Sequence, residues 1–489
     1  MKIEKVMLIN TDNDAELPRN ANGDSFPPLG IISLGTVLKN RHQVNICLMD
    51  GQVDDIATIE RRMFGFSPDL VGISVYSTSI RASIRLLKYA KTIGAVTVAG
   101  NDHILMHYTE YLNVVPELDY ACLNDVGEET LSALVDHLTG KISINTVPLL
   151  GYRDATGNIK VTPERSSIRP GRSLDTLPIP DRNLLPLRDW RHDAERFSAQ
   201  ARSLFSFDKP IVTTINRARG CAQRKSRCVY CGIADLSIRY SSGLVFWEDV
   251  QSAMRDIGAS VFYEAFDSAS SAPKVLEEWY HTRPSQLEPH HFKFYAQACE
   301  SDSRVVQVLK SLNTFCVNMG LDSGDERTLK LLKGKRHSIQ QNVDALLRYK
   351  EAGIEVYTSF VLLGLGSDKE TKRSLDQTIT FIKWMLQNTS VVSFDCALLY
   401  PDRNAPVGRA IWEGDSTVLT NPEWNFLDVQ TLTEVGNRWK GRLFIDPMEI
   451  CSDFARACGV SPYLLMDYEH QIERLASSTG FNYGRSQGG

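Results

Sequence analysis

Residues 219–233 read RGCAQRKSRCVYCGI and place Cys221, Cys228 and Cys231 in the spacing C-x6-C-x2-C. Two sulfurs in a C-x2-C turn commonly bind one metal centre, and a six-residue loop is long enough to return a third sulfur to it. Structural zinc prefers four protein ligands, and no fourth Cys or His lies inside this stretch. Three thiolates on a four-iron cluster would leave one iron open. A structural zinc site and three unrelated thiols are the alternatives.

Basic side chains surround these three residues, which we call the cluster cysteines. Nearby cations lower the pKa of a thiol and offset the negative charge of a metal–thiolate centre. We therefore expect lowered thiol pKa values in this stretch. The basic residues concerned are Arg219, Arg224, Lys225 and Arg227.

The region from residue 206 to about residue 405 alternates short apolar runs with helical stretches such as residues 343–350. Six runs predict strands, at residues 211–215, 261–265, 292–296, 314–320, 355–363 and 391–398. Six β/α units predict a full or partial barrel, whose chemistry is expected at the carboxyl ends of the strands. The cysteine stretch follows the first strand, and the later strand ends carry Asp267, Glu300, Asp322, Gly364, Gly366 and Tyr400.

The amino-terminal third shows a separate α/β pattern. Five apolar runs predict strands at residues 6–10, 44–48, 70–75, 96–99 and 120–123. Amphipathic stretches lie between them, which is typical of a doubly wound sheet that binds ligands at the carboxyl ends of its strands. Those ends carry small or polar residues: Asn10, Ser74, Ser77, Thr78, Ser79, Gly100, Asn101, Asp102, His103, Asp125, Val126, Gly127 and Glu128.

The chain between and after these two regions completes the predicted domain organisation. Residues 146–205 carry six prolines, a density that breaks regular elements and suits a linker. We expect an amino-terminal domain over residues 1–145, a linker over 146–205, a barrel over 206–405 and a small helical region over 406–489. In that last region Cys451 and Cys458 are expected to be packed thiols rather than a second metal site.

Composition narrows the class of function. The 489 residues include 54 Lys and Arg against 59 Asp and Glu, a net charge of -5 that disfavours nucleic-acid binding by bulk charge. The start, MKIEKVMLIN, lacks the long apolar region of a signal peptide, and no apolar stretch approaches the roughly 20 residues that span a bilayer. We therefore expect a cytoplasmic protein without nucleic-acid or membrane partners, whose ten cysteines are thiols or ligands rather than disulfides.

Four further motifs accompany the cluster cysteines: PDRNLLPL at residues 180–187, GLDSG at 320–324, LLGLGSDKET at 362–371 and LLYPDRNAPV at 398–407. Together they resemble the radical SAM superfamily, specifically its cobalamin-binding branch. In this family three cysteines, usually spaced C-x3-C-x2-C, hold a [4Fe-4S] cluster whose open iron binds S-adenosylmethionine (SAM). The loop here is three residues longer, which still allows three sulfurs to reach one cluster. The resemblance covers about residues 1–410 and implies an α/β protein with a cobalamin-binding domain before a partial barrel.

The resemblance also implies residues that contact SAM. Either Asp267 or Glu264 would bind the amino group, and the sequence leaves both open. Asp322 would lie near the sugar or methionine moiety, and Gly364 belongs to a strand end that contacts SAM in the family. A carboxylate suits such positions because SAM carries an ammonium group and two ribose hydroxyls.

Four segments, at residues 26–40, 68–79, 98–103 and 125–131, resemble successive elements of the family's cobalamin-binding domain. The resemblance implies a cofactor whose nucleotide tail inserts into the α/β domain. It implies no protein His on cobalt, because the sequence has no D-x-H-x-x-G motif. For one of the implied contacts, His103, a histidine at a helix start or packed against neighbouring residues is an equally good interpretation. The implied contacts are Ser74, Ser77, Thr78, Gly100, His103 and Gly127.

The function implied by the resemblance is methyl transfer from SAM to a carbon atom of a small molecule. Unactivated carbon is not nucleophilic, so such a reaction needs the radical chemistry that these cofactors supply. A radical cyclisation or ring rearrangement without net methylation is the first alternative, and a non-enzymatic cobalamin or iron–sulfur sensing protein is the second. We expect an electron donor such as flavodoxin or ferredoxin as a partner, and a substrate from specialised metabolism such as antibiotic biosynthesis.

Overall fold

The five apolar runs of the amino-terminal third form parallel strands in one sheet. They are β1 (Lys5–Asn10), β2 (Asn45–Asp50), β3 (Leu70–Ser74), β4 (Val96–Gly100) and β5 (Tyr120–Cys122). The sheet has the order β2-β1-β3-β4-β5-β6-β7. The order reverses between β1 and β3, and in doubly wound sheets the ligand crevice lies at the carboxyl ends of the strands at this point.

Helices cover both faces of this first sheet, which explains why its strands are apolar on both sides. One face packs against α1 and α5 through residues such as Leu38 and Leu134. The other face packs against α2, α3 and α4 through residues such as Met63 and Leu86. The helices are α1 (Leu29–His42), α2 (Ile56–Phe66), α3 (Ile80–Thr92), α4 (Asp102–Val114) and α5 (Gly127–Leu138).

The first sheet continues past residue 145, where the sequence predicted a linker. Two short antiparallel strands, β6 (Leu150–Arg153) and β7 (Ile159–Val161), extend it at the β5 edge. Pro148 and Pro163 flank this hairpin and interrupt neither strand, so the proline density did not exclude regular structure. We therefore propose that the amino-terminal domain ends after residue 161.

The six runs predicted for the barrel form parallel strands of a second seven-stranded sheet. They are β9 (Val212–Ile215), β12 (Val261–Glu264), β13 (His291–Tyr295), β14 (Thr314–Asp322), β15 (Glu355–Leu362) and β16 (Val391–Leu398). A seventh, β17 (Asn482–Tyr483), pairs with β16 at one edge, while β9 forms the other edge. Among the residues that the structure describes, β9 and β17 do not pair, so the sheet is open and the partial barrel is confirmed.

The helices of the partial barrel begin where the sequence supplies caps. Five of the six start after a Ser or Asp whose side chain accepts a backbone N–H of the first turn. They are α7 (Gly243–Ile257), α8 (Pro273–His281), α9 (Ser303–Ser311), α10 (Glu326–Lys333), α11 (Ile339–Ala352) and α12 (Asp368–Asn388).

The carboxyl-terminal region is helical as predicted, but it is continuous with the barrel. Its helices are α13 (Pro406–Trp412), α14 (Val429–Trp439), α15 (Pro447–Ala457) and α16 (Pro462–Ser478). The first three share a core with Leu363 and Leu399, at the carboxyl ends of β15 and β16. Leu465 and Ile472 of α16 belong to the main core of the barrel. Cys451 and Cys458 are both buried, as expected for packed thiols.

The short elements complete the chain. A small sheet joins β8 (Gly171–Arg172), β11 (Arg239–Tyr240) and β10 (Ala218–Arg219), and so ties the region after the first domain to the barrel. The 3-10 helices are η1 (Ile144–Thr146), η2 (Leu174–Thr176), η3 (Arg182–Leu184), η5 (Ala269–Ser271), η6 (Ala298–Glu300) and η7 (Pro422–Trp424).

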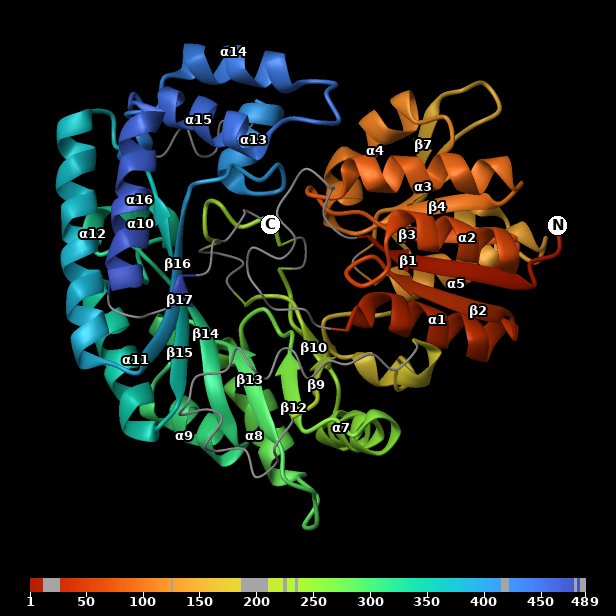
Figure 1. Ribbon diagram of the computed structural model, residues 1–489, viewed down its shortest axis with the longest axis horizontal. Helices are drawn as coiled ribbons and strands as arrows, with labels where there is room; N and C mark the ends of the chain where they lie inside the picture. Colours follow the sequence, from red (N-terminus) through yellow and green to blue (C-terminus); the bar gives the residue numbers. More distant parts are fainter. Residues whose placement is uncertain are drawn as a thin grey trace.

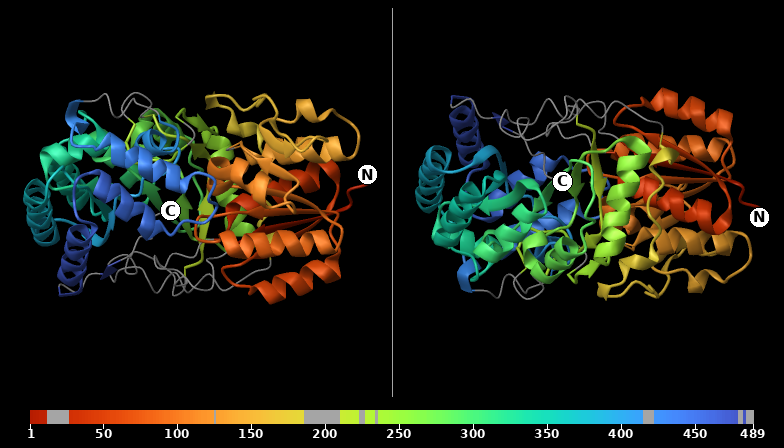
Figure 2. Two further views of the ribbon diagram at one scale, coloured as in Figure 1. Left: turned by 90° about the horizontal axis from the view of Figure 1, so that it is seen from above. Right: turned by 90° about the horizontal axis from the view of Figure 1, so that it is seen from below.

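The computed structural model describes residues 1–11, 27–124, 126–185, 210–222, 227–233, 236–414, 422–478 and 482–483. Figure 1 shows the two sheets side by side, with α13, α14 and α15 lying over one end of the barrel. Seen from above and below, the two domains lie along one long axis (Figure 2). Over the described ranges, none of the helices has the length and apolar character needed to cross a bilayer.

Candidate functional site

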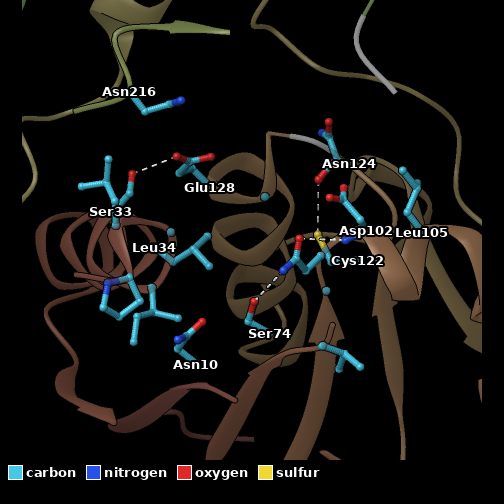
Figure 3. A pocket seen from close by; sticks show the side chains of 18 of the residues that line it. Asn10, Ser33, Leu34, Ser74, Asp102, Leu105, Cys122, Asn124, Glu128 and Asn216 are labelled. Atoms are coloured by element: carbon cyan, nitrogen blue, oxygen red, sulfur yellow. Dashed lines mark hydrogen bonds between the residues drawn. The ribbon is translucent and has the colours of Figure 1, made fainter. Parts of the chain in front are cut away.

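One cavity of about 1000 Å³ lies between the two domains. Its walls come from the carboxyl ends of β1, β3, β4 and β5, from the start of α1, and from the segment that links β9 to the cluster cysteines. In Figure 3, Ser33 and Glu128 of the first domain lie on the side of the cavity where the second domain contributes Asn216. The strand-end crevice predicted for the first domain therefore faces the barrel, which contributes part of its lining.

All six residues implied as cobalamin contacts line this cavity: Ser74, Ser77, Thr78, Gly100, His103 and Gly127. Asn101 orients Ser74, because its side-chain nitrogen donates to Ser74 Oγ at 3.1 Å. Asn101 itself has a φ of 83° and a ψ of 173° at the start of α4, a strained backbone conformation that is otherwise essentially restricted to glycine. Asp125 lies outside the described residues.

His103 is held by packing as well as facing the cavity. Its Nδ1 lies 3.1 Å from the Tyr111 hydroxyl, and its ring stacks on His107 with 4.6 Å between centroids. Burial lowers the pKa of His103 to about 3, and the neighbouring His107 adds to this effect, so the ring is neutral at pH 7. His103 is therefore a packed histidine on the cavity wall, and its contact with cobalamin stays a prediction.

The cavity also has walls that the sequence did not single out. The start of α1 contributes Pro28, Leu29 and Gly30, and the segment after β3 contributes Tyr76. The segment at residues 26–40 had been matched to a cobalamin domain, so its position along the chain was a usable signal. Tyr76, whose hydroxyl donates to Asn10 Oδ1 at 3.0 Å, likewise lies in a matched segment, residues 68–79, although it was not named as a contact.

The cluster cysteines lie at the barrel end of this cavity. Gly220 and Gly232, the neighbours of Cys221 and Cys231, both line it. Cys231 and Cys228 are joined in a turn by a backbone hydrogen bond of 3.2 Å. The guanidinium of Arg227 supports this turn by donating to the carbonyl of Cys231 at 2.8 Å.

Cys228 and Cys231 have raised pKa values, which corrects the expectation that nearby cations lower them. Burial raises the pKa of Cys228 to about 12, against a smaller opposing effect of Lys333. Burial also raises the pKa of Cys231, and Arg227 only partly offsets it. Arg219 forms an ion pair with Glu128 instead, and Arg224 and Lys225 lie outside the described residues. Desolvation therefore outweighs the local positive charge.

The cluster cysteines also act on one another electrostatically. Negative charge on Cys221 and Cys231 raises the pKa of Cys228, and charge on Cys221 raises that of Cys231. Within the described residues, no three His, Cys, Asp or Glu side chains meet at a point that could hold a single metal ion. A four-iron cluster needs no such point, because each of its three cysteines binds a different iron. One buried and two half-buried thiols that interact with one another suit this donor set, and metal binding displaces their protons.

The four residues implied as SAM contacts occupy different environments. Asp267 lines the cavity, and its Oδ2 accepts the N–H of Gly220, next to Cys221, at 2.7 Å. Glu264 is fully buried and accepts the N–H groups of Arg217 and Ala218 at 2.9 and 3.2 Å. Burial raises the pKa of Glu264 to about 8, so this carboxyl is largely protonated at neutral pH. Asp267 is therefore the better placed of the two for an ammonium group.

Asp322 and Gly364 lie away from the cavity lining. Asp322 is buried and pairs with the Nζ of Lys333 at 2.9 Å. Gly364 is closely packed, because an added Cβ would lie 3.0 Å from atoms of Cys458 and Val460. Its lack of a side chain is thus explained by the carboxyl-terminal region.

An ion pair joins the two domains beside the cavity. The guanidinium of Arg219 lies 2.8 Å from Oε1 of Glu128, which also accepts the Ser33 hydroxyl at 2.8 Å. Burial acts to raise the pKa of Glu128, but Arg219 outweighs it and the pKa is lowered to about 2. The sequence contained no signal for this pair, which is formed by residues 91 positions apart.

Comparison with known families agrees with both halves of this site. Residues 20–135 match the family model of the B12 binding domain, and residues 215–382 match that of the radical SAM superfamily. The chain therefore contains a B12 binding domain and a radical SAM domain, which confirms the predicted resemblance to the cobalamin-binding branch of the radical SAM superfamily. The cofactors predicted from the sequence, a [4Fe-4S] cluster, SAM and cobalamin, are those of these two domains.

Individual proteins similar to this chain include two methyltransferases. An uncharacterized methyltransferase of Pyrococcus horikoshii is 24% identical over 442 residues, which cover 84% of this chain and 83% of that protein. Cytidylyl-2-hydroxyethylphosphonate methyltransferase of Streptomyces wedmorensis is 23% identical over 327 residues, covering 63% of this chain and 60% of its own.

Two solved structures share the fold across both domains. The cobalamin-dependent SAM radical enzyme OxsB, with aqua-cobalamin and SAM bound, matches with a TM-score of 0.67 and 16% identity, covering 98% of this chain and 72% of that one. The radical SAM methyltransferase TsrM from Kitasatospora setae, with cobalamin and a [4Fe-4S] cluster bound, matches with a TM-score of 0.66 and 16% identity, covering 86% and 80%. At this identity the likeness concerns the fold.

Proposed function

We propose that this enzyme transfers a methyl group from SAM to a carbon atom of a small-molecule substrate. The observation that carries the proposal is the single cavity shared by the cobalamin-domain strand ends and the segment beside the cluster cysteines. A shared cavity lets groups bound by the two domains act on one substrate without its release. Both similar proteins described above are named methyltransferases, which supports the same reaction class.

Each part of the cavity has a role in this proposal. Ser74, Gly100 and Gly127 leave room for cobalamin at the sheet edge, because short side chains allow close approach of a bulky ring. The cluster cysteines hold the [4Fe-4S] cluster, and Asp267 accepts the ammonium group of SAM. When bound, these groups supply one-electron chemistry and a methyl carrier. An electron donor such as flavodoxin or ferredoxin would reduce the cluster.

Asp267 and Glu264 provide a matched pair that tests the SAM position. Asp267→Asn removes a charge that faces the cavity, so we expect SAM affinity to fall about tenfold, the loss of one charge-assisted hydrogen bond. Glu264→Gln replaces a carboxyl that is already mostly protonated, so SAM affinity should change little. Equilibrium binding of SAM to the reconstituted protein measures both. Equal affinities in the two variants would contradict the assignment of Asp267.

The experiment that tests the function is an anaerobic assay with methyl-labelled SAM and candidate metabolites, followed by untargeted mass spectrometry. A product that gains the labelled methyl group confirms methyl transfer. Its by-products report the acceptor: S-adenosylhomocysteine together with 5′-deoxyadenosine indicates an sp3 carbon, and S-adenosylhomocysteine alone indicates an sp2 carbon. 5′-Deoxyadenosine with an unmethylated product would replace the proposal by cyclisation or rearrangement, and absence of both by-products would favour a sensing protein.

A variant without the cluster is the control for this assay. Replacing any one of the cluster cysteines by Ala should abolish iron and sulfide loading after anaerobic reconstitution and should abolish SAM cleavage. Cys47→Ala, which alters a buried thiol of the first domain, should leave both unchanged. Full loading in all three cluster variants would refute the cluster assignment, and zinc in place of iron would support the structural alternative.

A further inference from the structure

The side-chain amide of Gln297 lies between two cysteines at the carboxyl end of β13. Its Nε2 donates to Sγ of Cys221 at 3.5 Å, and its Oε1 accepts from the thiol of Cys299 at 3.9 Å. Sγ of Cys299 in turn lies 3.6 Å from Nε2 of His337. Four side chains from three segments of the barrel are thus connected in a row that ends at a cluster cysteine.

The protonation states determine which group donates each hydrogen bond in this row. Burial raises the pKa of Cys299 to about 11, so the group is a thiol with one S–H, which points to Gln297 Oε1. Its sulfur is then free to accept the N–H of His337. Burial lowers the pKa of His337 to about 3, so this ring is neutral and carries one N–H. Each group donates to the next, from His337 through Cys299 and Gln297 to Cys221.

The backbone holds Gln297 in place for this contact. Its N–H donates to Ser270 Oγ at 2.7 Å, and its carbonyl accepts the Ser301 hydroxyl at 2.7 Å. Ser301 also lies 2.8 Å from the hydroxyl of Tyr349, which is fully buried. The backbone of Gln297 is therefore held in place while its side-chain amide contacts Cys221. The Cys299 thiol determines that the amide nitrogen, and not the amide oxygen, faces the Cys221 sulfur.

We propose that Gln297 is a positioning residue that raises the reduction potential of the [4Fe-4S] cluster through its N–H···S hydrogen bond to Cys221, and that Cys299 and His337 orient its amide. The inference rests on the assignment of the cluster cysteines. Reduction adds one negative charge, part of which resides on the sulfur ligands. A hydrogen bond to sulfur stabilises the more negative state, and such bonds are among the determinants of cluster potentials.

The test is a redox titration of the reconstituted full-length protein without SAM, followed by electron paramagnetic resonance of the reduced cluster. Gln297→Leu keeps most of the side-chain volume and removes the donor. We expect it to disfavour reduction about tenfold, a shift of about 59 mV to more negative potential for a one-electron couple. Gln307→Leu, the same change at an exposed position of α9, should leave the potential unchanged.

A second pair of variants leaves Gln297 in place. Cys299→Ser keeps a donor to Oε1 and should retain the wild-type potential, whereas Cys299→Ala removes it and should lower the potential by less than Gln297→Leu does. If Gln297→Leu fails to load iron, the comparison of Cys299→Ser with Cys299→Ala still tests whether the orientation of the Gln297 amide affects the reduction potential.

The outcomes separate this inference from the assignment on which it rests. A wild-type protein that binds no four-iron cluster refutes the assignment of the cluster cysteines. A loaded Gln297→Leu variant with the wild-type potential overturns the inference alone, as do equal potentials in Cys299→Ser and Cys299→Ala.

Discussion

Gly30 offers a direct test of where cobalamin binds. It lies in the first turn of α1 and lines the cavity, and an added Cβ would meet no heavy atom within 4 Å. Gly65, near the end of α2, also has nothing within 4 Å of an added Cβ, but it lies outside the cavity lining. Gly30→Leu and Gly65→Leu therefore differ in one respect: the first places a side chain where the cofactor is expected.

The magnitudes follow from these positions. Replacing a helical Gly by a good helix former stabilises a helix by up to about 1 kcal/mol, so both variants should fold at least as well as the wild type. Inserting a side chain into a filled site costs about 1–3 kcal/mol. Because about 1.4 kcal/mol corresponds to a factor of ten, cobalamin affinity should fall about 5- to 150-fold in Gly30→Leu and remain unchanged in Gly65→Leu.

The assay combines equilibrium dialysis with hydroxocobalamin and urea unfolding of the cofactor-free protein. Unfolding confirms that each variant is intact, and dialysis gives the dissociation constant. The reasoning would be refuted by a stably folded Gly30→Leu variant with wild-type affinity. An equal loss in Gly65→Leu would also count against it, because the effect would then not come from the cavity.

Two further predictions concern buried charges and are measured by urea unfolding of the cofactor-free protein. The carboxylate of Asp249 lies 2.7 Å from the guanidinium groups of both Arg182 and Arg217, and all three residues are buried. Asp249→Asn leaves these two cations without a counter-charge, so the free energy of unfolding should fall by about 3–5 kcal/mol. A fall below about 1 kcal/mol would contradict this. Glu128 has a folded-state pKa lowered to about 2 against an ordinary value of 4.5, so its contribution is fully present above about pH 4.5 and is lost as the pH falls toward 2. Glu128→Gln should flatten the pH dependence of stability in that interval, and an unchanged slope would show that Glu128 does not titrate there.

The strands could be predicted because their signal is local. Every predicted strand of both sheets was found within a few residues of its expected limits, since buried parallel strands are continuous apolar runs bounded by polar ends. The β6–β7 hairpin was missed for the same reason. Its strands are four and three residues long, and β7 has only exposed or half-buried positions, so neither forms such a run.

The sequence predicted residues of the candidate site that line the cavity, but it did not predict the pKa values of the cluster thiols. Ser74 and Gly100 are the last residues of buried strands, and their position at the sheet edge is set by topology alone. The thiol pKa values depend on burial, which arises when α10 and the segment after β16 pack over the cysteine loop. Two backbone hydrogen bonds hold this packing: the N–H of Val229 donates to the carbonyl of Leu332, and the N–H of Val407 donates to the carbonyl of Val229. Nothing within residues 219–233 records those contacts. Gly364 likewise depends on a contact with Val460, almost a hundred residues away.

The ion pair between Arg219 and Glu128 helps to hold the two halves of the site in a fixed position relative to one another. Arg219 is two residues from Cys221, and Glu128 follows Gly127, which lines the cavity beside β5. A buried ion pair contributes little net stability, because desolvation of the two charges offsets their attraction. Breaking it is costly, however, since each partner would be left buried and charged. The pair therefore opposes separation of the domains at the point where the cluster-side segment meets the cobalamin-side helix. In the reaction proposed above, the pair would fix the distance between two cofactor sites whose groups act on one substrate.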